Sequence, residues 1–383
     1  MTELFEIEGS QRQFHEIIKV IGIGGGGGNA LNHIVRSGVR GIEFIAANTD
    51  IAHLSLSEAD LKIVLGRELT KGLGAGADPD IGLRAAEESI EEMREILKDA
   101  DMVFLTAGMG GGTGTGATPI IAQIAKENGS LVVAVTTRPF MFEGKIRNSQ
   151  AFEGIGNLRN NVDALIVVPN DRLLEISQKG TTLSEAFKLA DDVLRQAVQG
   201  VTDLILRPGL VNVDFADVRT IMKDAGTAIM GIGEGKGEDR ASKAAHAAIN
   251  SPLMDGPING ARGILFNVTG GPNVGIHEIQ EAAQVVTEAA DPEATILWGH
   301  VLDPDMDEKI QITVIATGFS TESVPLGPRH RIRDHKNVLV EIEARSGVKE
   351  AEHHNPAGDA ESQESREDID KPAITRRKSR RRL

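Results

Sequence analysis

The sequence has 383 residues, which is long enough for two domains with buried cores at roughly 100 to 200 residues per domain. Its formal charge of −15 disfavours nucleic acid as a partner, because phosphate backbones are also negative. The absence of Cys excludes disulfides, thiolate metal sites and Cys nucleophiles, and no apolar run reaches the roughly 18 to 20 residues of a membrane span. We therefore expect a soluble, cytoplasmic protein without a transmembrane span.

Short β-rich runs alternate with helical patterns in the first half of the sequence. Strands are predicted at 17–23, 42–47, 102–107, 131–136 and 164–169. Helices are predicted at 30–37, 80–98 and 118–128. This alternation is typical of an α/β domain with a Rossmann-like, mostly parallel sheet and helices on both faces, which we assign to residues 15–182.

The second half begins with one long amphipathic pattern. From Leu183, apolar residues recur every three or four positions as far as residue 205, which predicts a helix that stops before Pro208. Its wide apolar stripe indicates a central helix, 183–207, packed between layers. Beyond it, strands at 263–269 and 309–317 with a helix at 276–289 between them predict a smaller α+β second domain, 208–319.

The two ends of the chain differ from the body in composition. Residues 1–14 are expected to form a flexible N-terminus. No aromatic residue follows Phe319, so residues 320–367 are expected to be a disordered linker that cannot bury enough apolar area to fold. Residues 371–383 contain seven basic residues and no acidic one, and they give the final segment, 368–383, a cationic tip.

Two glycine-rich loops each follow a predicted strand and precede a helix. The first is 22–28, and the second, 108–116, also contains two Thr residues. Glycine lets backbone N–H groups approach a phosphate, and the following helix N-terminus adds the positive end of its dipole. A third loop, 72–76, could cover the same crevice. Convergence of three such loops favours a polyphosphate ligand.

The first loop alone leaves other functions open. It also fits the dinucleotide fingerprint, with Asp50 placed about 20 residues on as a ribose-binding acid. An NAD-dependent dehydrogenase is therefore one alternative, and a nucleotide-binding scaffold without hydrolysis is another. The dehydrogenase leaves the Thr residues of the second loop unexplained. His pairs with zinc-ligand spacing and a Gly-x-Ser-x-Gly nucleophile motif are absent from the sequence.

Several motifs together resemble the tubulin and FtsZ superfamily over roughly residues 15–319. The run Gly-Gly-Gly-Thr-Gly-Thr-Gly at 110–116 resembles its signature loop, and 24–29 resembles the first glycine loop of its bacterial branch. Segments 137–147 and 212–217 match in order and spacing. The resemblance implies a GTPase that assembles head to tail with copies of itself into the bacterial division ring. It also implies GTP as ligand, with Mg²⁺ bridging the β- and γ-phosphates.

The resemblance also implies a nucleotide site. Asp191 would accept hydrogen bonds from the two adjacent donors of guanine, and Phe187 would stack on the base. The other contacts would come from Gly25, Gly26, Asn29, Gly74, Ala75, Gly108, Gly110, Gly111, Gly112, Thr113, Gly114, Thr137, Pro139, Glu143, Arg147 and Asn170. From the residues alone, Asp191 could instead be a solvated helix charge, Phe187 could be a core residue, and Glu143 with Arg147 could be an ordinary helix ion pair.

Catalytic residues are implied in the second domain. Asn212, Asp214 and Asp217 match the family's catalytic loop, whose acids orient the attacking water on the nucleotide of the next subunit. From the residues alone, an Asp at the start of a helix is more commonly a simple N-cap.

Partners beyond a second copy are implied by the final segment. Residues 368–383 resemble the family's tail peptide, which docks on membrane-tethering division proteins, although Lys371 and Ile374 depart from its usual pattern. Division regulators are further expected partners, at the mid-cell ring on the inner face of the membrane. The basic residues at 376–382 could also be solvated or contact acidic lipid.

Overall fold

The computed structural model describes residues 16–177, 180–207, 209–254 and 256–319. The expected N-terminus (1–14), linker (320–367) and tail peptide (368–383) lie outside these residues. The described residues belong to one compact unit, and none of their helices is long and apolar enough to cross a membrane.

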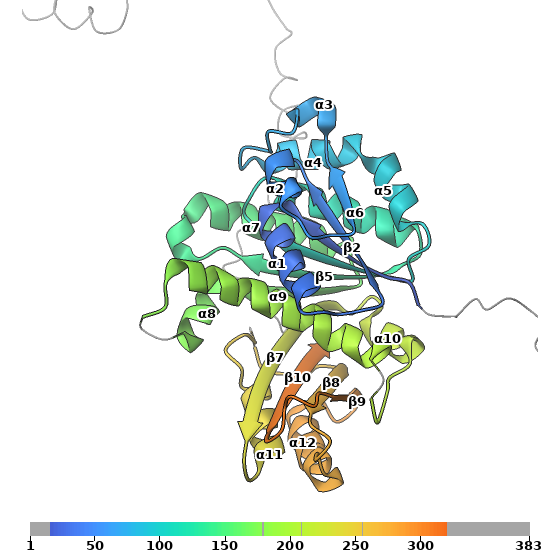
Figure 1. Cartoon of the computed structure of the whole chain (residues 1–383), viewed down its shortest axis with the longest axis vertical. Coiled ribbons are helices and arrows are strands. Elements are labelled where there is room, and N and C mark those ends of the chain that lie inside the picture. The colour runs from blue at the N-terminus through green and yellow to red at the C-terminus, as the bar shows by residue number, and fades with distance from the viewer. Residues whose placement is uncertain (1–15, 178–179, 208, 255, 320–383) are drawn as a thin grey trace, which may run out of the picture. The chain divides into compact units, whose positions relative to one another are not determined.

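One mixed sheet runs through the described residues, in the strand order β3-β2-β1-β4-β5-β6-β7-β10-β8-β9 (Figure 1). Its parallel part comprises β1 (Ile18–Ile23), β2 (Ile42–Asn48), β3 (Leu61–Val64), β4 (Met102–Gly108), β5 (Leu131–Arg138) and β6 (Ala164–Pro169). Because β1 pairs with β2 on one side and β4 on the other, the connections after these two strands leave in opposite directions. A crevice therefore opens at their carboxyl ends.

Helices cover both faces of the parallel strands. Ile18 and Val20 of β1 belong to one buried cluster, and Ile21 and Ile23 belong to another, as alternation along a strand requires. The first face carries α1 (Gly24–Arg36), α9 (Leu183–Leu206) and α10 (Phe215–Met222). The second face carries α4 (Pro79–Glu88), α5 (Ile90–Leu97), α6 (Thr113–Glu127) and α7 (Lys145–Arg159). The expected Rossmann-like layering is confirmed.

The strands after α10 form the second part of the sheet. β7 (Gly226–Lys236) continues the sheet from β6, and it is followed by β8 (Gly263–Gly270), β9 (Thr295–Leu302) and β10 (Lys309–Thr317). α11 (Arg240–Ile249) and α12 (Ile276–Ala289) cover these strands around a third core, against which the half-buried Trp298 packs. The remaining short elements are α2 (Ile51–Ser55), α3 (Arg67–Thr70), η1 (Met141–Glu143) and α8 (Asn170–Ile176).

The long helix α9 agrees with its predicted span. Thr182 and Glu185 form a capping box at its start, with Thr182 Oγ1 accepting from Glu185 N–H at 3.3 Å. The helix ends at Leu206, and its C-cap residue Arg207 has the extended backbone that is favoured before a proline. At 1.5 Å per residue, α9 is about 36 Å long. Its buried stripe joins the core that it shares with α1 and the sheet.

Three helices differ from their predicted bounds. The expected helix 80–98 is broken at Ser89, whose Oγ accepts a hydrogen bond from Gly66 N–H at 3.1 Å. The expected helices 30–37 and 118–128 begin earlier, at Gly24 and Thr113, so they include part of each glycine loop. Intrinsic propensity disfavours glycine in a helix, and tertiary contact overrides it here.

Candidate functional site

A cavity of 370 Å³ lies at the carboxyl ends of β1, β4, β5 and β6 and is closed on one side by α9. A volume of this size is typical of small-molecule sites. The lining residues are Ile23, Gly25, Gly26, Asn29, Gly108, Met109, Gly111, Gly112, Thr113, Gly114, Thr137, Pro139, Glu143, Arg147, Asn170, Phe187, Ala190, Asp191 and Leu194. Every residue that we expected at the nucleotide lines this cavity, except Gly74, Ala75 and Gly110.

These three residues instead make contacts within and between the glycine loops and their neighbours. Gly110 has a φ of 93°, and its N–H donates to Thr115 Oγ1 at 2.8 Å. Ala75 is buried, and its Cβ would lie 2.8 Å from a Cβ added at Gly112. Gly74 N–H donates to the carbonyl of Thr49 at 3.1 Å. In the structure they therefore support the second glycine loop and its neighbours rather than line the cavity.

The two glycine loops touch each other at one end of the cavity. A Cβ added at Gly24, where φ is 70°, would lie 2.9 Å from Gly114 N. A Cβ at Gly26 would lie 3.3 Å from Gly108 Cα. Only glycine permits this approach, which places the N-termini of α1 and α6 side by side. Two convergent helix N-termini supply backbone N–H donors and positive dipole ends, the arrangement that binds phosphate groups.

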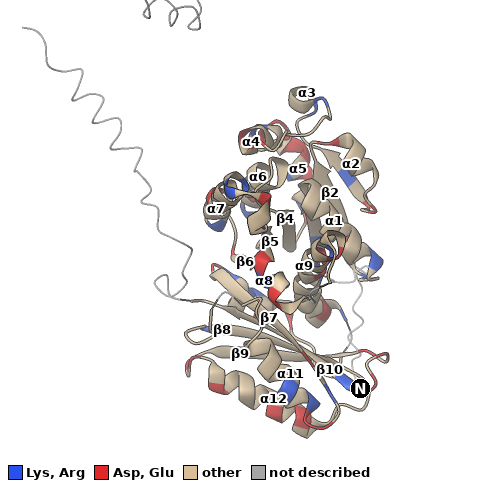
Figure 2. Cartoon of the chain, turned by 90° about the vertical axis from the view of Figure 1, so that its left-hand side faces the viewer, with Lys and Arg blue, Asp and Glu red and all other residues tan. Residues whose placement is uncertain are grey.

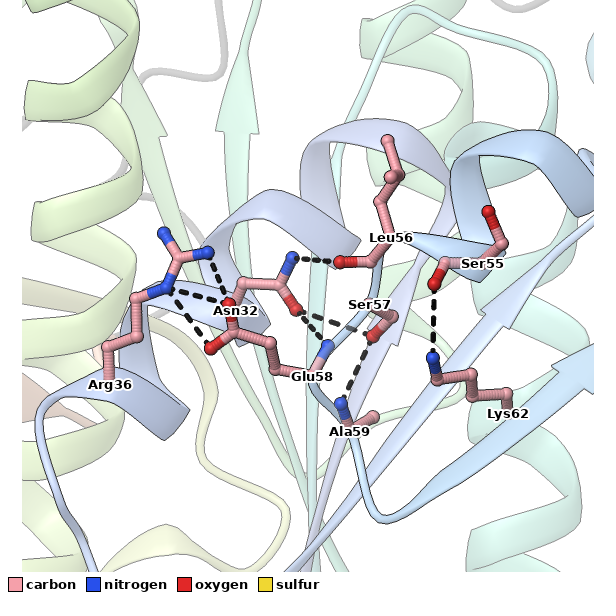
Figure 3. Close-up of polar contacts among 8 residues, drawn as sticks. All are labelled: Asn32, Arg36, Ser55, Leu56, Ser57, Glu58, Ala59 and Lys62. Carbon is pink, nitrogen blue, oxygen red and sulfur yellow. Dashed lines mark hydrogen bonds and ion pairs between the residues drawn. The ribbon is translucent and has the colours of Figure 1, made fainter.

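A polar network fixes α1 against the segment that follows α2 (Figure 3). Asn32 Oδ1 accepts from Glu58 N–H at 2.8 Å, and Asn32 Nδ2 donates to the Leu56 carbonyl at 3.4 Å. Arg36 Nε donates to Glu58 Oε1 at 2.9 Å. Because α1 begins with the first glycine loop, contacts that fix α1 also help to fix the position of that loop.

The other end of the cavity carries an aromatic side chain and a half-buried carboxyl, both on α9. Phe187 packs edge-on against the fully buried Phe140, with 5.5 Å between the ring centroids, and remains 40% exposed. Asp191 lies one turn further along α9, and burial raises the pKa of its carboxyl to about 7. The Asp191 carboxylate has no hydrogen-bond partner among the described residues, so a flat base with two adjacent donors would stack on Phe187 and donate to it.

Polar side chains line the rim between the two ends. Asn170 is 5% exposed, and its Oδ1 has no hydrogen-bond partner among the described residues, so a ligand donor would satisfy it. Arg147 is paired with Glu143, which also accepts from Phe140 N–H at 2.9 Å. The pair predicted for an ordinary helix therefore exists, and it lies at the cavity rim.

Four lining residues were not predicted: Ile23, Met109, Ala190 and Leu194. Ala190 and Leu194 lie three and seven positions after Phe187, so helical periodicity could have placed them on the same face. Asp50, the acid of the dinucleotide alternative, caps α2 by accepting from Ala52 N–H at 2.9 Å and does not line the cavity. The structure gives that alternative no support.

The three predicted catalytic residues lie away from the cavity, after the C-terminal end of α9. Asp214 is the N-cap residue of α10, yet its side chain makes no capping hydrogen bond. Asp214 and Asp217 are exposed, and neither carboxylate has a hydrogen-bond or ion-pair partner among the described residues. Asn212 Oδ1 accepts from Gly209 N–H at 2.7 Å, which shapes the loop. The two carboxylates are available to a ligand or a second molecule.

The loop that carries these residues is held against β9. His300 N–H donates to the Val211 carbonyl at 3.0 Å, and a Cβ at Gly209 would lie 1.8 Å from the His300 carbonyl oxygen. A Cβ at Gly299 would lie 3.1 Å from the Val211 carbonyl oxygen. These contacts fix the position of residues 209–213 before any partner arrives.

Comparison with known proteins identifies relatives of both parts of the chain. Residues 17–178 match the sequence model of the Tubulin/FtsZ family, GTPase domain, and residues 226–320 match that of the FtsZ family, C-terminal domain. An empty FtsZ dimer from M. jannaschii is 45% identical, with a TM-score of 0.78, and the match covers 80% of this chain and 89% of that one. GDP-bound monomeric CetZ1 from Haloferax volcanii is 22% identical, with a TM-score of 0.69 over 85% of this chain and 99% of that one, and it shares the fold.

Proposed function

The chain belongs to the tubulin/FtsZ family and is a GTPase, and on that premise we propose that it forms head-to-tail protofilaments and hydrolyses GTP between successive copies. The proposed setting is the bacterial division ring, which rests on the resemblance of residues 24–29 to the bacterial glycine loop. A structure of CetZ2 from Haloferax volcanii is described as a GTPγS-bound protofilament, and it supports the fold's capacity to polymerise.

One observation carries the proposal: the cavity and the two acids lie at opposite ends of α9. The last cavity residue on α9 is Leu194, and the helix continues to Leu206, which is about 18 Å further along its axis. In Figure 1, α8 lies at one end of α9 and α10 at the other. Asp214 and Asp217 therefore cannot reach a γ-phosphate in their own chain's cavity, whereas the acids of a second copy could reach it.

Exposed apolar side chains lie near both ends of α9, beside the cavity and beside the acids, and they support stacking of copies. Beside the cavity, Met141 is 76% exposed, Phe142 is 60% exposed and Ile146 is 77% exposed. In the loop before the acids, Leu210 is 77% exposed. Exposed apolar side chains that rim a polar site are typical of surfaces that bury against a partner.

The proposed chemistry divides between two copies. In one copy, Asp191 would select guanine, and the N-termini of α1 and α6 would hold the phosphates. In the next copy, Asp214 and Asp217 would orient the attacking water and accept its proton. Phosphoryl transfer depends mainly on such positioning and on neutralising charge.

We include Mg²⁺ in the proposal as an ion carried by the nucleotide. Among the described residues, no group of three or more His, Asp or Glu could hold a metal ion, so a protein cage is not available there. Mg²⁺ commonly keeps several waters and binds substrate phosphates with few protein ligands, and Thr113 offers a hydroxyl beside the phosphate end. Bound there, it would neutralise charge on the β- and γ-phosphates.

Residues 368–383 are proposed to bind membrane-tethering division proteins, and division regulators are proposed as further partners. The resulting location is the cytoplasmic face of the membrane at mid-cell. Support comes from the tail's sequence resemblance alone.

Turnover as a function of protein concentration tests the shared site. GTP hydrolysis per subunit should rise with concentration and nearly vanish below the assembly threshold, because an isolated copy lacks the acids of its neighbour. Sedimentation at each concentration gives the assembled fraction. Constant turnover per subunit from dilute to concentrated protein would show that each chain is a complete enzyme.

A further inference from the structure

A second and larger cavity, of 590 Å³, forms a groove between α4, α6 and α7. Figure 2 shows these three helices next to one another in the upper part of the view. None of the residues that we assign to guanine, phosphate or water lines the groove. It therefore remains available while the nucleotide cavity is occupied.

The charge of the groove has one sign. Asp78, Asp80 and Glu153 line it, and no Lys, Arg or His does. Asp80 and Glu153 are exposed, and neither carboxylate has an ion-pair partner among the described residues. The carboxamides of Gln150 and Asn157 add acceptor oxygens. Carboxylates with neighbouring acceptors suit guanidinium groups, which present several donors in a fixed plane.

The groove also has an apolar wall and lies directly behind the phosphate end of the nucleotide cavity. Leu83, Pro119 and Ile120 contribute the wall. Thr115 also lines the groove, and its Oγ1 accepts from Gly110 N–H in the second glycine loop at 2.8 Å. An occupant would therefore contact the helix whose N-terminus faces the phosphates.

The chain's own sequence contains a segment with the complementary chemistry. Residues 374–382 combine one apolar side chain, Ile374, with six basic residues and no acidic one. Ile374 would pack on the apolar wall while Arg376 and Arg377 pair with the carboxylates.

We propose that the groove between α4, α6 and α7 binds the cationic tip, residues 374–382, of a second copy of this chain. The 54 residues from 320 to 373 span at most roughly 190 Å, so the tip can reach a neighbouring molecule. The contact would join copies without using the nucleotide cavity or the catalytic acids Asp214 and Asp217. A tip bound in the groove would not be available to a membrane tether.

Cross-linking between two tagged proteins tests this contact, because the chain has no Cys of its own. Full-length Asn157→Cys is mixed with full-length Ser379→Cys and a short bismaleimide, with GDP and without GTP. We expect a mixed dimer at least five times more abundant than with Gln284→Cys, an exposed position on α12, in place of Asn157→Cys. High salt should abolish the excess, because the contact is electrostatic.

Charge reversal supplies the matched control. Asp80→Lys with Glu153→Lys should reduce the mixed dimer to the Gln284→Cys background. Glu87→Lys with Glu281→Lys makes the same change of net charge at exposed positions outside the groove and should leave the yield unchanged. Equal yields from both charge variants would overturn the proposal. If a chain that carries both Asn157→Cys and Ser379→Cys cross-links only within itself, while the two single variants give no mixed dimer above background, the assignment to a second copy is overturned. The readout requires no GTP hydrolysis, so its failure is distinguishable from failure of the shared active site.

Discussion

Asp191 is the residue whose ionisation links nucleotide binding to pH. Burial raises the pKa of its carboxyl to about 7 in the nucleotide-free protein, because the charged form is poorly solvated there. Two guanine donors would stabilise the charged form and lower that pKa in the complex. Binding near neutral pH would therefore release a proton.

GTP affinity should consequently rise with pH. With a free-state pKa near 7, the ionised fraction of Asp191 grows roughly tenfold between pH 6 and pH 8, so the Kd for GTP should fall by about that factor. Calorimetry in buffers of different ionisation enthalpy measures both the Kd and the released proton. In Asp191→Asn the Kd for GTP should be larger by roughly ten- to a hundredfold and nearly independent of pH. A wild-type-like pH profile in this variant would remove Asp191 from guanine recognition.

The same shift has a stability consequence in the nucleotide-free protein. The folded state retains the Asp191 proton from the ordinary value of 3.8 up to about 7, so this stabilising contribution is present at low pH and is lost as pH rises through about 7. Asp191→Asn should therefore raise the Tm of the nucleotide-free protein at pH 8 and have little effect at pH 4. An unchanged Tm at pH 8 would indicate that the carboxylate is well solvated.

A substitution at Asp214 can distinguish a catalytic role for this residue from a helix-capping role. A working N-cap contributes about 1 kcal/mol, whereas the Asp214 side chain makes no capping hydrogen bond. Asp214→Ala should leave the Tm within about 2 °C of the parent and GTP binding unchanged, while turnover falls by roughly a hundredfold or more. Thermal melts, GTP titration and phosphate release measure the three quantities. A clear loss of Tm with normal turnover would favour the cap.

Among the helices and strands, periodicity predicted those whose sequence buries one regular apolar face. α9 and β10 followed from apolar spacing, because each buries a regular stripe. β7 was not predicted, since Gly231, Gly233 and Gly235 interrupt its pattern. Their reason is tertiary: a Cβ at each would lie 1.8 to 2.1 Å from a carbonyl oxygen of α11. The local sequence of β7 does not indicate that α11 will pack against these glycines.

In the candidate site too, motifs predicted some residues, whereas contacts between distant segments determine others. The glycine loops and strand-end residues were found from motifs, because their spacing along the chain is fixed by the strands they follow. The support of Phe187 by Phe140 was not predicted, since the two rings are far apart in sequence and meet only when α9 crosses the sheet. Gly74 and Ala75 do not line the cavity for a similar reason: their contacts, with Thr49 and Gly112, join segments that are distant in sequence.

Two glycines of α7 should respond oppositely to the same substitution. A Cβ at Gly154 would lie 2.3 Å from Thr115 Cγ2. If Thr115 turned away, the hydrogen bond from Gly110 N–H in the second glycine loop to Thr115 Oγ1 would be lost. Gly154→Ala should therefore lower the Tm and weaken GTP binding severalfold. Gly156→Ala meets open space on the same helix and should stabilise the protein by about 0.5 to 1 kcal/mol. Melts and GTP titrations of both variants make the comparison. Equal GTP affinity in the two would show that α7 does not brace the loop.

The whole molecule has polarity, because the cavity and the acids occupy opposite ends of α9. If each copy completes its neighbour's site, two inactive chains can restore activity together. Thr113 is buried and its Oγ1 lies 2.7 Å from Thr49 Oγ1, so Thr113→Arg should block nucleotide binding and keep the acids. Asp217→Ala should bind GTP and fail to hydrolyse it.

Mixing these two variants should return measurable turnover, at most about a quarter of the parental rate per total chain at equal amounts, because only one order of neighbours is complete. Phosphate release from the mixture, compared with each variant alone, measures it. No recovery, in a mixture that co-sediments as one polymer, would contradict hydrolysis across the interface. Full turnover by Asp217→Ala alone would show that this acid is dispensable.

The position of Trp298 gives the molecule a natural optical probe. It is the only Trp, the chain has no Tyr, and it precedes Gly299, which lies against the loop of Val211. Side chains alternate along β9, so the indole packs on the third core while the adjacent Gly299 faces the loop that precedes Asp214 and Asp217. Its emission should change when a second copy docks against that loop and remain steady when GTP enters an isolated chain. Unlabelled protein can therefore report the arrival of its neighbour in real time.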